Sequence, residues 1–198
     1  MMNTALEICN RALSKLGQRQ ISGLSQPSDP VSMQCSLLYH PARRETLCAC
    51  RWSFAVRTES LMPLPVLNGV EELMPPFTVQ YALPTRCLRV LDVPLRKWSL
   101  SGRRLLALGR AEDALTITFI DNVEDGCVFD PLFTDALVCR LAEKLALPVT
   151  GSQSLRQSLL NEYHKVLLPQ AAHINQVQYQ SNDQHPLDDI LSRSLFSR

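Results

Sequence analysis

The chain has 198 residues, of which 45% are hydrophobic and 20% are charged, and its twenty basic and nineteen acidic side chains leave a formal net charge of +1. This composition is typical of a globular protein and excludes a collagen-like repeat, a coiled-coil rod and a wholly disordered chain. The near-neutral charge argues against nonspecific nucleic-acid binding, because that binding depends on a surplus of Lys and Arg to neutralise phosphates.

Two helices are predicted in the first part of the chain, residues 1–52. The first covers about residues 4–17, where apolar residues recur at helical spacing and a glycine provides a typical stop. Asp29-Pro30 then has the pattern of an N-cap followed by proline at the first helical position, and the second helix should extend to about Ala49. Pro41 should kink or break this second helix, because proline has no backbone N–H to donate.

Residues 53–129 show instead the period of two that is typical of half-buried β-strands. Apolar residues alternate with polar or small ones at 54–58, 77–83 and 115–119. Ser101-Gly102 separates two further short apolar runs and indicates a hairpin turn. We therefore expect residues 53–129 to form a β-rich lobe.

Residues 130–175 return to the helical period. Asp130-Pro131 has the same pattern as Asp29-Pro30, an N-cap residue followed by proline at the first helical position. Four large apolar side chains follow at intervals of four residues: Phe133, Leu137, Leu141 and Leu145. Pro148 should end this helix, and a further helix should begin near Ser152. Because isolated helices of this length are marginal in water, we expect the helices from both ends of the chain to pack together. The predicted fold class is α+β: a helical bundle formed by the N- and C-terminal helices, with an inserted β-rich lobe and an extended C-terminal tail.

The extended C-terminal tail comprises residues 176–198. Residues 176–185 are polar, a composition that favours a flexible linker. Five apolar side chains then supply one face of a predicted short amphipathic helix: Leu187, Ile190, Leu191, Leu195 and Phe196. We predict that these five residues dock on a partner protein or on a neighbouring subunit. The alternative is that the tail folds back on its own subunit as an extra helix.

The search for catalytic and metal-binding motifs is largely negative. The seven glycines are scattered singly, so the sequence lacks a Gly-rich phosphate loop. Cys48 and Cys50 form a close pair, but residues two apart on a helix point to different faces and would make a poor chelate with His40. His164 and His173 lie nine residues apart on a predicted helix, which is too far for joint ligation. We therefore predict no catalytic, cofactor-binding or metal-binding residues.

Two further features are interpreted as structural. The basic pairs Arg43-Arg44 and Arg103-Arg104 have no aromatic residues interleaved, and we interpret them as solvated charge. The alternative for these pairs is contact with an acidic partner surface. Trp52 and Phe54 follow the second helix directly and are interpreted as a core anchor of the junction between helix and strand.

The sequence carries no signal for export or for a membrane. No segment approaches the roughly eighteen consecutive apolar residues of a transmembrane helix. Residues 1–7 lack the basic start and apolar run of a signal peptide. The seven cysteines are irregularly spaced, and we interpret them as reduced and mostly buried. We expect a protein with no membrane contact that is made in a reducing cytoplasm, or held in an assembly built there.

Five blocks of sequence follow one another in a recognisable order: residues 5–17, Tyr39-His40-Pro41-Ala42-Arg43-Arg44-Glu45, Arg51-Trp52-Ser53-Phe54-Ala55, Tyr81-Ala82-Leu83-Pro84 with Cys87-Leu88-Arg89-Val90, and Phe129-Asp130-Pro131-Leu132-Phe133. In the order and spacing of these blocks the chain resembles, over about residues 4–175, the tail tubular protein A family, the head-to-tail adaptors of short-tailed bacteriophages. The most specific block is Trp-Ser-Phe-Ala after the Pro-Ala-Arg-Arg-Glu helix. Arg86 departs from the family, in which an acidic residue is expected, and residues 176–198 match least well.

The resemblance implies a structural role and no enzymatic activity. It implies a dodecameric ring beneath the portal protein, which bridges the portal to the tail nozzle and lines a channel through which DNA passes without specific binding. The implied location is the neck and tail of the virion, after assembly in the host bacterial cytoplasm, and the tail would dock on the portal or on a neighbouring adaptor. Two alternatives stay open: a cytoplasmic helical protein–protein interaction module, and an enzyme with a site scattered over both parts of the chain.

Overall fold

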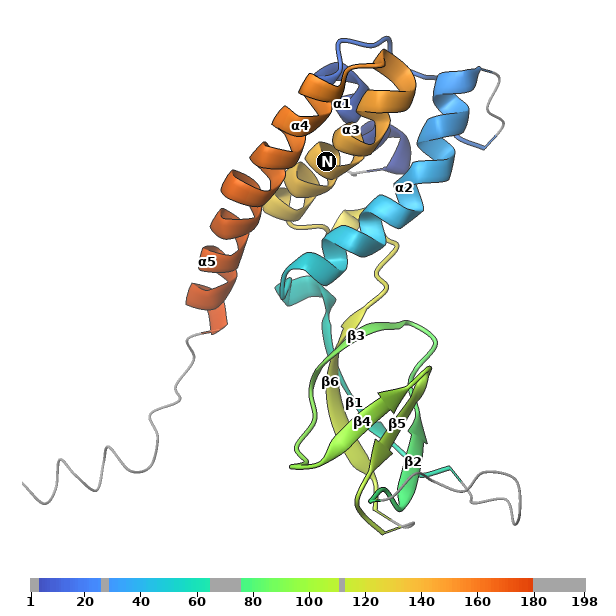
Figure 1. Ribbon diagram of the computed structural model, residues 1–198, viewed down its shortest axis with the longest axis vertical. Helices are drawn as coiled ribbons and strands as arrows, with labels where there is room; N and C mark the ends of the chain where they lie inside the picture. Colours follow the sequence, from blue (N-terminus) through green and yellow to red (C-terminus); the bar gives the residue numbers. More distant parts are fainter. Residues whose placement is uncertain (1–3, 26–28, 65–75, 111–112, 180–198) are drawn as a thin grey trace, which may run out of the picture.

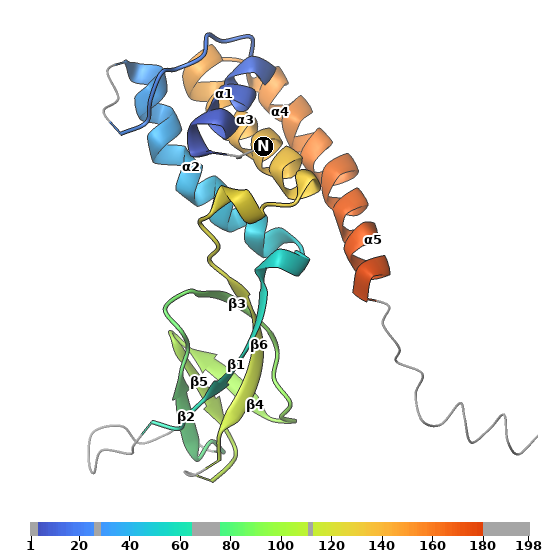
Figure 2. The same cartoon turned by 180° about the vertical axis from the view of Figure 1, so that it is seen from behind.

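The computed structural model describes residues 4–25, 29–64, 76–110 and 113–179. Helices form both ends of the described chain and two antiparallel sheets form its middle, so the fold class is α+β, as the sequence predicts. We call α1–α5 the helical part and β1–β6 the sheet part. The two parts occupy opposite ends of the molecule, and the chain passes from one to the other and back (Figure 1, Figure 2).

Helix α1 (Ala5–Lys15) begins and ends at the predicted signals. The hydroxyl oxygen of Thr4 accepts a hydrogen bond from the backbone N–H of Glu7 at the start of the helix. Gly17 follows the helix with a φ of 66°, a left-handed conformation that glycine adopts without strain. The helix buries one face of small and apolar residues: Ile8, Cys9, Ala12 and Leu13.

Helix α2 (Pro30–Ala49) begins at Asp29, whose carboxylate accepts hydrogen bonds from two N–H groups of the first turn. The helix continues through Pro41 as one element, so the predicted break does not occur. Proline removes the hydrogen bond to the carbonyl group of Leu37, and Leu37 is exposed, so water can satisfy that group.

Helix α3 (Pro131–Thr150) lies at the centre of the helical part and contacts α1, α2 and α4. Its four predicted core residues are fully buried: Phe133, Leu137, Leu141 and Leu145. The prediction that α3 ends at Pro148 is wrong. The helix ends at Gly151, which has a φ of 67° and donates its N–H to the carbonyl oxygen of Leu147. Pro148 costs the helix one hydrogen bond, the one that an N–H at this position would donate to the carbonyl oxygen of Lys144, and the helix still continues for two residues beyond it.

The C-terminal helices form one continuous rod that comprises α4 (Gln153–Glu162), a π-helical turn (Tyr163–Leu167) and α5 (Leu168–Tyr179) (Figure 1). Leu159 and Tyr163 face the core, as the helical spacing predicts. Val166 lies seven residues after Leu159 and would share its face in a regular α-helix, but it is exposed, because a π-turn changes the number of residues per turn and rotates the face. Pro169 follows this turn directly and does not end the rod.

The sheet part contains two three-stranded antiparallel sheets. The first has the order β1 (Val56–Leu61), β6 (Leu115–Asp121), β3 (Cys87–Asp92), and the second has the order β2 (Val79–Ala82), β5 (Arg104–Ala107), β4 (Trp98–Ser101). Leu115, Ile117 and Phe119 of β6 face a core shared by both sheets, which confirms the period of two in this segment. β4 and β5 are joined by a tight turn in which Gly102 has a φ of 56°, so the predicted hairpin is confirmed.

The helical part and the sheet part have separate cores that meet along β6. Phe119 packs in the core of the sheets, whereas the next residue, Ile120, packs in the core of the helices. Successive residues of a strand point to opposite faces, so one strand can contribute to both cores. The position of the sheet part against the helices therefore depends in part on the residues at this end of β6 and at the start of β1.

Candidate functional site at the helix–sheet junction

Four aromatic side chains meet where the chain passes between the helical and sheet parts: Trp52, Phe54, Phe129 and Phe133. We call them the junction cluster. The ring of Phe133 contacts those of Trp52, Phe54 and Phe129 in edge-on geometry, with centroid separations of 5.1, 5.1 and 4.7 Å. The indole N–H of Trp52 also donates to the carbonyl oxygen of Thr46 at 2.8 Å. The interpretation of Trp52 and Phe54 as an anchor of this junction is confirmed.

Arg43, on α2, ties the helical part to the segment that follows β6. Its guanidinium donates to the carbonyl oxygen of Val123 (2.8 Å), to Asn122 Oδ1 (3.0 Å) and to Glu124 Oε1 (2.9 Å). Only 2% of its side chain is exposed. The interpretation of this basic pair as solvated charge is therefore wrong for Arg43, whereas Arg44 is exposed as expected.

The helical periodicity of α2 contains the signal that sequence reasoning missed for Arg43. Arg43 lies four residues after Tyr39 and four before Leu47, and both neighbours are buried, so it is in phase with the buried face. The hydrogen bond and the charge of Arg43 lower the pKa of Glu124, which keeps that carboxylate ionised and paired at neutral pH. The charge of Arg43 is therefore paired within the chain instead of facing solvent.

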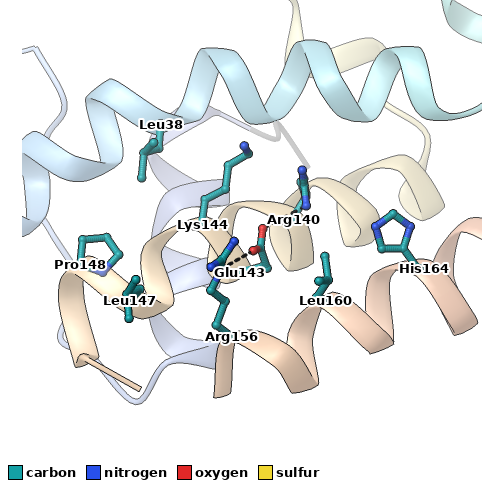
Figure 3. Close-up of a pocket in the computed structure, with 9 residues that line it drawn as sticks. All are labelled: Leu38, Arg140, Glu143, Lys144, Leu147, Pro148, Arg156, Leu160 and His164. Atoms are coloured by element: carbon teal, nitrogen blue, oxygen red, sulfur yellow. Dashed lines mark hydrogen bonds and ion pairs between the residues drawn. The ribbon is translucent and has the colours of Figure 1, made fainter. Parts of the chain in front are cut away.

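A groove runs along the helical part between α2 and α4, with α3 as its floor (Figure 3). We call it the α2–α4 groove. Its volume is about 450 Å³, and its lining residues come from three helical segments: Leu38 from α2, Arg140, Glu143, Lys144, Leu147 and Pro148 from α3, and Arg156, Leu160 and His164 from α4 and the turn after it. Apolar and cationic side chains therefore line the same groove.

An ion-pair network fixes the charged side chains of the α2–α4 groove. The buried carboxylate of Glu143 accepts hydrogen bonds from Arg140 (3.0 Å) and Arg156 (2.8 Å). Glu45, on α2, accepts from Arg140 and from Lys144, each at 2.9 Å. Burial tends to raise the pKa of Glu45, but the hydrogen bonds from Lys144 and Arg140 outweigh this effect and lower it. The network joins α2, α3 and α4.

The second basic pair is also bonded within the molecule. Arg103 donates to the carbonyl oxygens of Pro84 and Cys87, and Arg104 donates to Gln80 Oε1 at 3.1 Å. These contacts join the end of the β4–β5 hairpin to β2 and to the start of β3. The interpretation of Arg103-Arg104 as solvated charge alone is therefore wrong.

Arg86, at which the resemblance leads us to expect an acidic residue, lies between two carboxylates. Its guanidinium is 2.8 Å from Glu59 Oε2 and 3.6 Å from Asp121 Oδ2. A basic side chain fits this position because acidic groups from β1 and β6 already face it. Arg86 thus holds the connection before β3 against the first sheet.

The remaining candidate residues are placed as follows. The predicted docking residues lie outside the described part of the chain: Leu187, Ile190, Leu191, Leu195 and Phe196. His164 and His173 are both exposed on helical segments, as expected. Within the described residues, no three His, Cys, Asp or Glu side chains are grouped so that they could hold a metal ion. Five of the seven cysteines are buried, Cys48 is half-buried and Cys127 is exposed, which confirms mostly buried thiols.

Comparison with known proteins assigns no family to the chain. No protein-family model matches it, and no curated protein matches it at a significant level. Among the helices of the described ranges, none combines the length and the apolar character needed to cross a bilayer. A functional assignment therefore depends on the sequence blocks and on the contacts that their residues make.

Proposed function

We propose that the chain is a structural virion protein, a head-to-tail adaptor that forms a ring between portal and tail nozzle and lines the DNA channel. Its proposed location is the neck of a short-tailed bacteriophage, which it reaches after assembly in the host cytoplasm. The proposal includes a dodecameric ring, contacts with the portal and nozzle proteins, and no enzymatic activity.

One observation carries this proposal: three of the sequence blocks that resemble the adaptor family meet at the helix–sheet junction. Block 39–45 supplies Arg43, and blocks 51–55 and 129–133 supply the junction cluster. Blocks that are far apart in the chain therefore build one structural joint. Such a joint would fix the helical part relative to the sheet part. A ring subunit needs this, because one part must contact neighbouring subunits while the other contacts the next component of the tail.

The electrostatics of the chain are consistent with a conduit for DNA. The guanidinium groups of several arginines form hydrogen bonds or ion pairs within the subunit, among them those of Arg43, Arg103 and Arg140. The formal net charge is only +1, so the chain has little surplus charge with which to neutralise phosphates. A channel that let DNA pass would benefit from this weak attraction.

The proposed subunit is a helical bundle of residues 1–52 and 130–175, with residues 53–129 inserted as a lobe and residues 176–198 as a docking tail. The contacts of α3 with α1, α2 and α4 support the bundle. Exposed apolar side chains on both parts offer different surfaces for head-to-tail contact: Met33 and Leu37 on α2, and Trp98 and Leu100 on β4. Contacts between two different surfaces close into a ring when the rotation permits.

Negative-stain electron microscopy of the purified protein mixed with its cognate portal tests this function. We expect rings seated on the portal, while sedimentation velocity shows the free protein to be largely monomeric. Portal alone is the control, because portal rings must be distinguished from an added layer. A stable isologous dimer that adds no layer to the portal would overturn the proposal and favour a helical interaction module.

A further inference from the structure

We propose that the α2–α4 groove is the docking site for residues 187–196 of a neighbouring copy of this chain. The inference rests on the proposed ring, which places copies side by side. It goes further than the ring, because it assigns the receptor surface, the occupant and the chemistry of their contact.

The apolar part of the groove lacks a cover within the described residues. Leu38 and Leu160 are half-buried on its two walls, and Leu147 on its floor is 46% exposed. Neighbouring helices of a globular protein normally cover such side chains with an apolar stripe. Segment 187–196 has such a stripe, and as a helix it would lie between α2 and α4.

The charges of the groove and of the segment are complementary. Three cations of the lining, Arg140, Lys144 and Arg156, share two carboxylates, Glu143 in the lining and Glu45 beside it, which leaves one positive charge in excess. Lys144 and Arg156 keep 21% and 43% of their side chains exposed, so an incoming carboxylate can reach them. The segment has two acidic residues, Asp188-Asp189, directly before its central apolar pair and one basic residue, Arg193, after it, so its net charge is negative. Such complementarity determines which partner and which register are favoured.

The lengths of groove and segment also agree. The groove extends over eight helical steps of the rod, from Arg156 to His164, which corresponds to about 12 Å at the helical rise. The apolar stripe extends from Leu187 to Leu195, again eight steps, which would correspond to about 12 Å as a helix. The stripe would therefore contact the groove along its whole length.

The reach of the chain favours a neighbouring copy over the same copy. The rod from Arg156 to Tyr179 has 23 helical steps and a length of about 35 Å (Figure 1). Nine steps separate Tyr179 from Asp188, and even a fully extended chain spans at most about 32 Å over nine residues. A tail that turned back along its own rod would have to be almost fully extended to bring Asp188 near Arg156, whereas the tail of a neighbour has no such limit.

Photo-crosslinking of the full chain tests the assignment. Phe196 is replaced by p-benzoylphenylalanine, and ¹⁴N- and ¹⁵N-labelled copies are mixed, assembled on the portal and irradiated. We expect mass spectrometry to find position 196 joined to the lining of the groove in mixed-isotope pairs. Links within one copy, or links to the portal or to other surfaces, would overturn the inference. Microscopy of the same sample reports separately whether rings formed, so failure of the docking site and failure of the proposed function are distinguishable.

Two variants sharpen the test. Leu147→Asp should reduce the yield of groove cross-links by about ten-fold, because it removes one apolar contact and repels the acidic segment. Leu108→Asp, at a similarly exposed leucine of the sheet part, should leave the yield unchanged. Asp188→Asn with Asp189→Asn alters only the segment and should also reduce the yield. Equal yields from all these proteins would overturn the inference.

Discussion

The guanidinium of Arg43, on α2, donates a 2.8 Å hydrogen bond to the carbonyl oxygen of Val123, eighty residues later in the chain. Arg43→Ala should lower the free energy of unfolding by about 2–4 kcal/mol, because the change removes a buried side chain together with its three hydrogen bonds and leaves a cavity. Urea unfolding followed by circular dichroism measures this loss. Arg44→Ala is the matched control at an exposed neighbour, and it should change stability by less than about 0.5 kcal/mol. Equal effects of the two variants would show that the junction does not depend on Arg43.

Gly151→Ala should destabilise the protein by about 1 kcal/mol, because alanine adopts the left-handed conformation only with strain. Gly151 has a φ of 67° and ends α3, although open space surrounds the position at which a Cβ would lie. Gly23→Ala is the control, since Gly23 has the same open space without a positive φ. Thermal unfolding compares them, and the prediction fails if Gly151→Ala is as stable as the wild type.

The lowered pKa of Glu45 predicts a pH dependence of stability. A carboxylate whose pKa is lower in the folded state stabilises it above the unfolded-state pKa of about 4.3 and loses this effect as the pH falls through the folded value. Glu45→Gln should therefore reduce stability at pH 7 by about 0.5–1 kcal/mol, a modest amount because the side chain is partly exposed and screened.

The difference between wild type and Glu45→Gln should shrink between pH 5 and pH 3. Chemical unfolding at several pH values measures this trend. High salt should also reduce the difference, because ions screen exposed pairs. A difference that stays constant across this pH range would contradict the role of Glu45 as an ionised partner of Arg140 and Lys144.

Thiol labelling should separate Cys127 from the buried cysteines. Cys127 is exposed, whereas burial raises the pKa of Cys139 to about 12. In pulses of iodoacetamide analysed by mass spectrometry, Cys127 should react first and Cys139 only after unfolding. The hydrogen bond to Asp125 raises the pKa of Cys127, so Asp125→Asn should increase its rate by about three-fold. Similar rates for both thiols in the native protein would contradict the described burial.

The elements that sequence reasoning predicted are those that local signals determine. Asp29 and Asp130 cap their helices, and Gly17 and Gly102 lie at the predicted stop and turn, because these effects depend on residues only a few positions apart. The predicted end of α3 at Pro148 is wrong because two local stop signals compete there. Proline only disfavours a continuing helix, whereas the left-handed conformation of Gly151 ends it.

Features that depend on distant contacts could not be predicted in this way. The partners of Arg43 follow β6, so its burial depends on how the sheet part returns to the helices. The α2–α4 groove depends on the spacing of three helices, and no one of them contains a motif for it. The rotation of Val166 out of the core follows from a π-turn, which the helical spacing does not contain.

The chain enters and leaves the sheet part at neighbouring points, because Val56 at the start of β1 lies opposite Ile120 near the end of β6. Opposing residues of antiparallel strands are only about 5 Å apart. Everything between these two residues is therefore a module whose ends nearly coincide. Evolution or an engineer could replace it with a longer or shorter module, or with one that has different surface residues, without moving α2 relative to α3. Such an arrangement would let the sheet part change its binding partner while the helical part keeps its own.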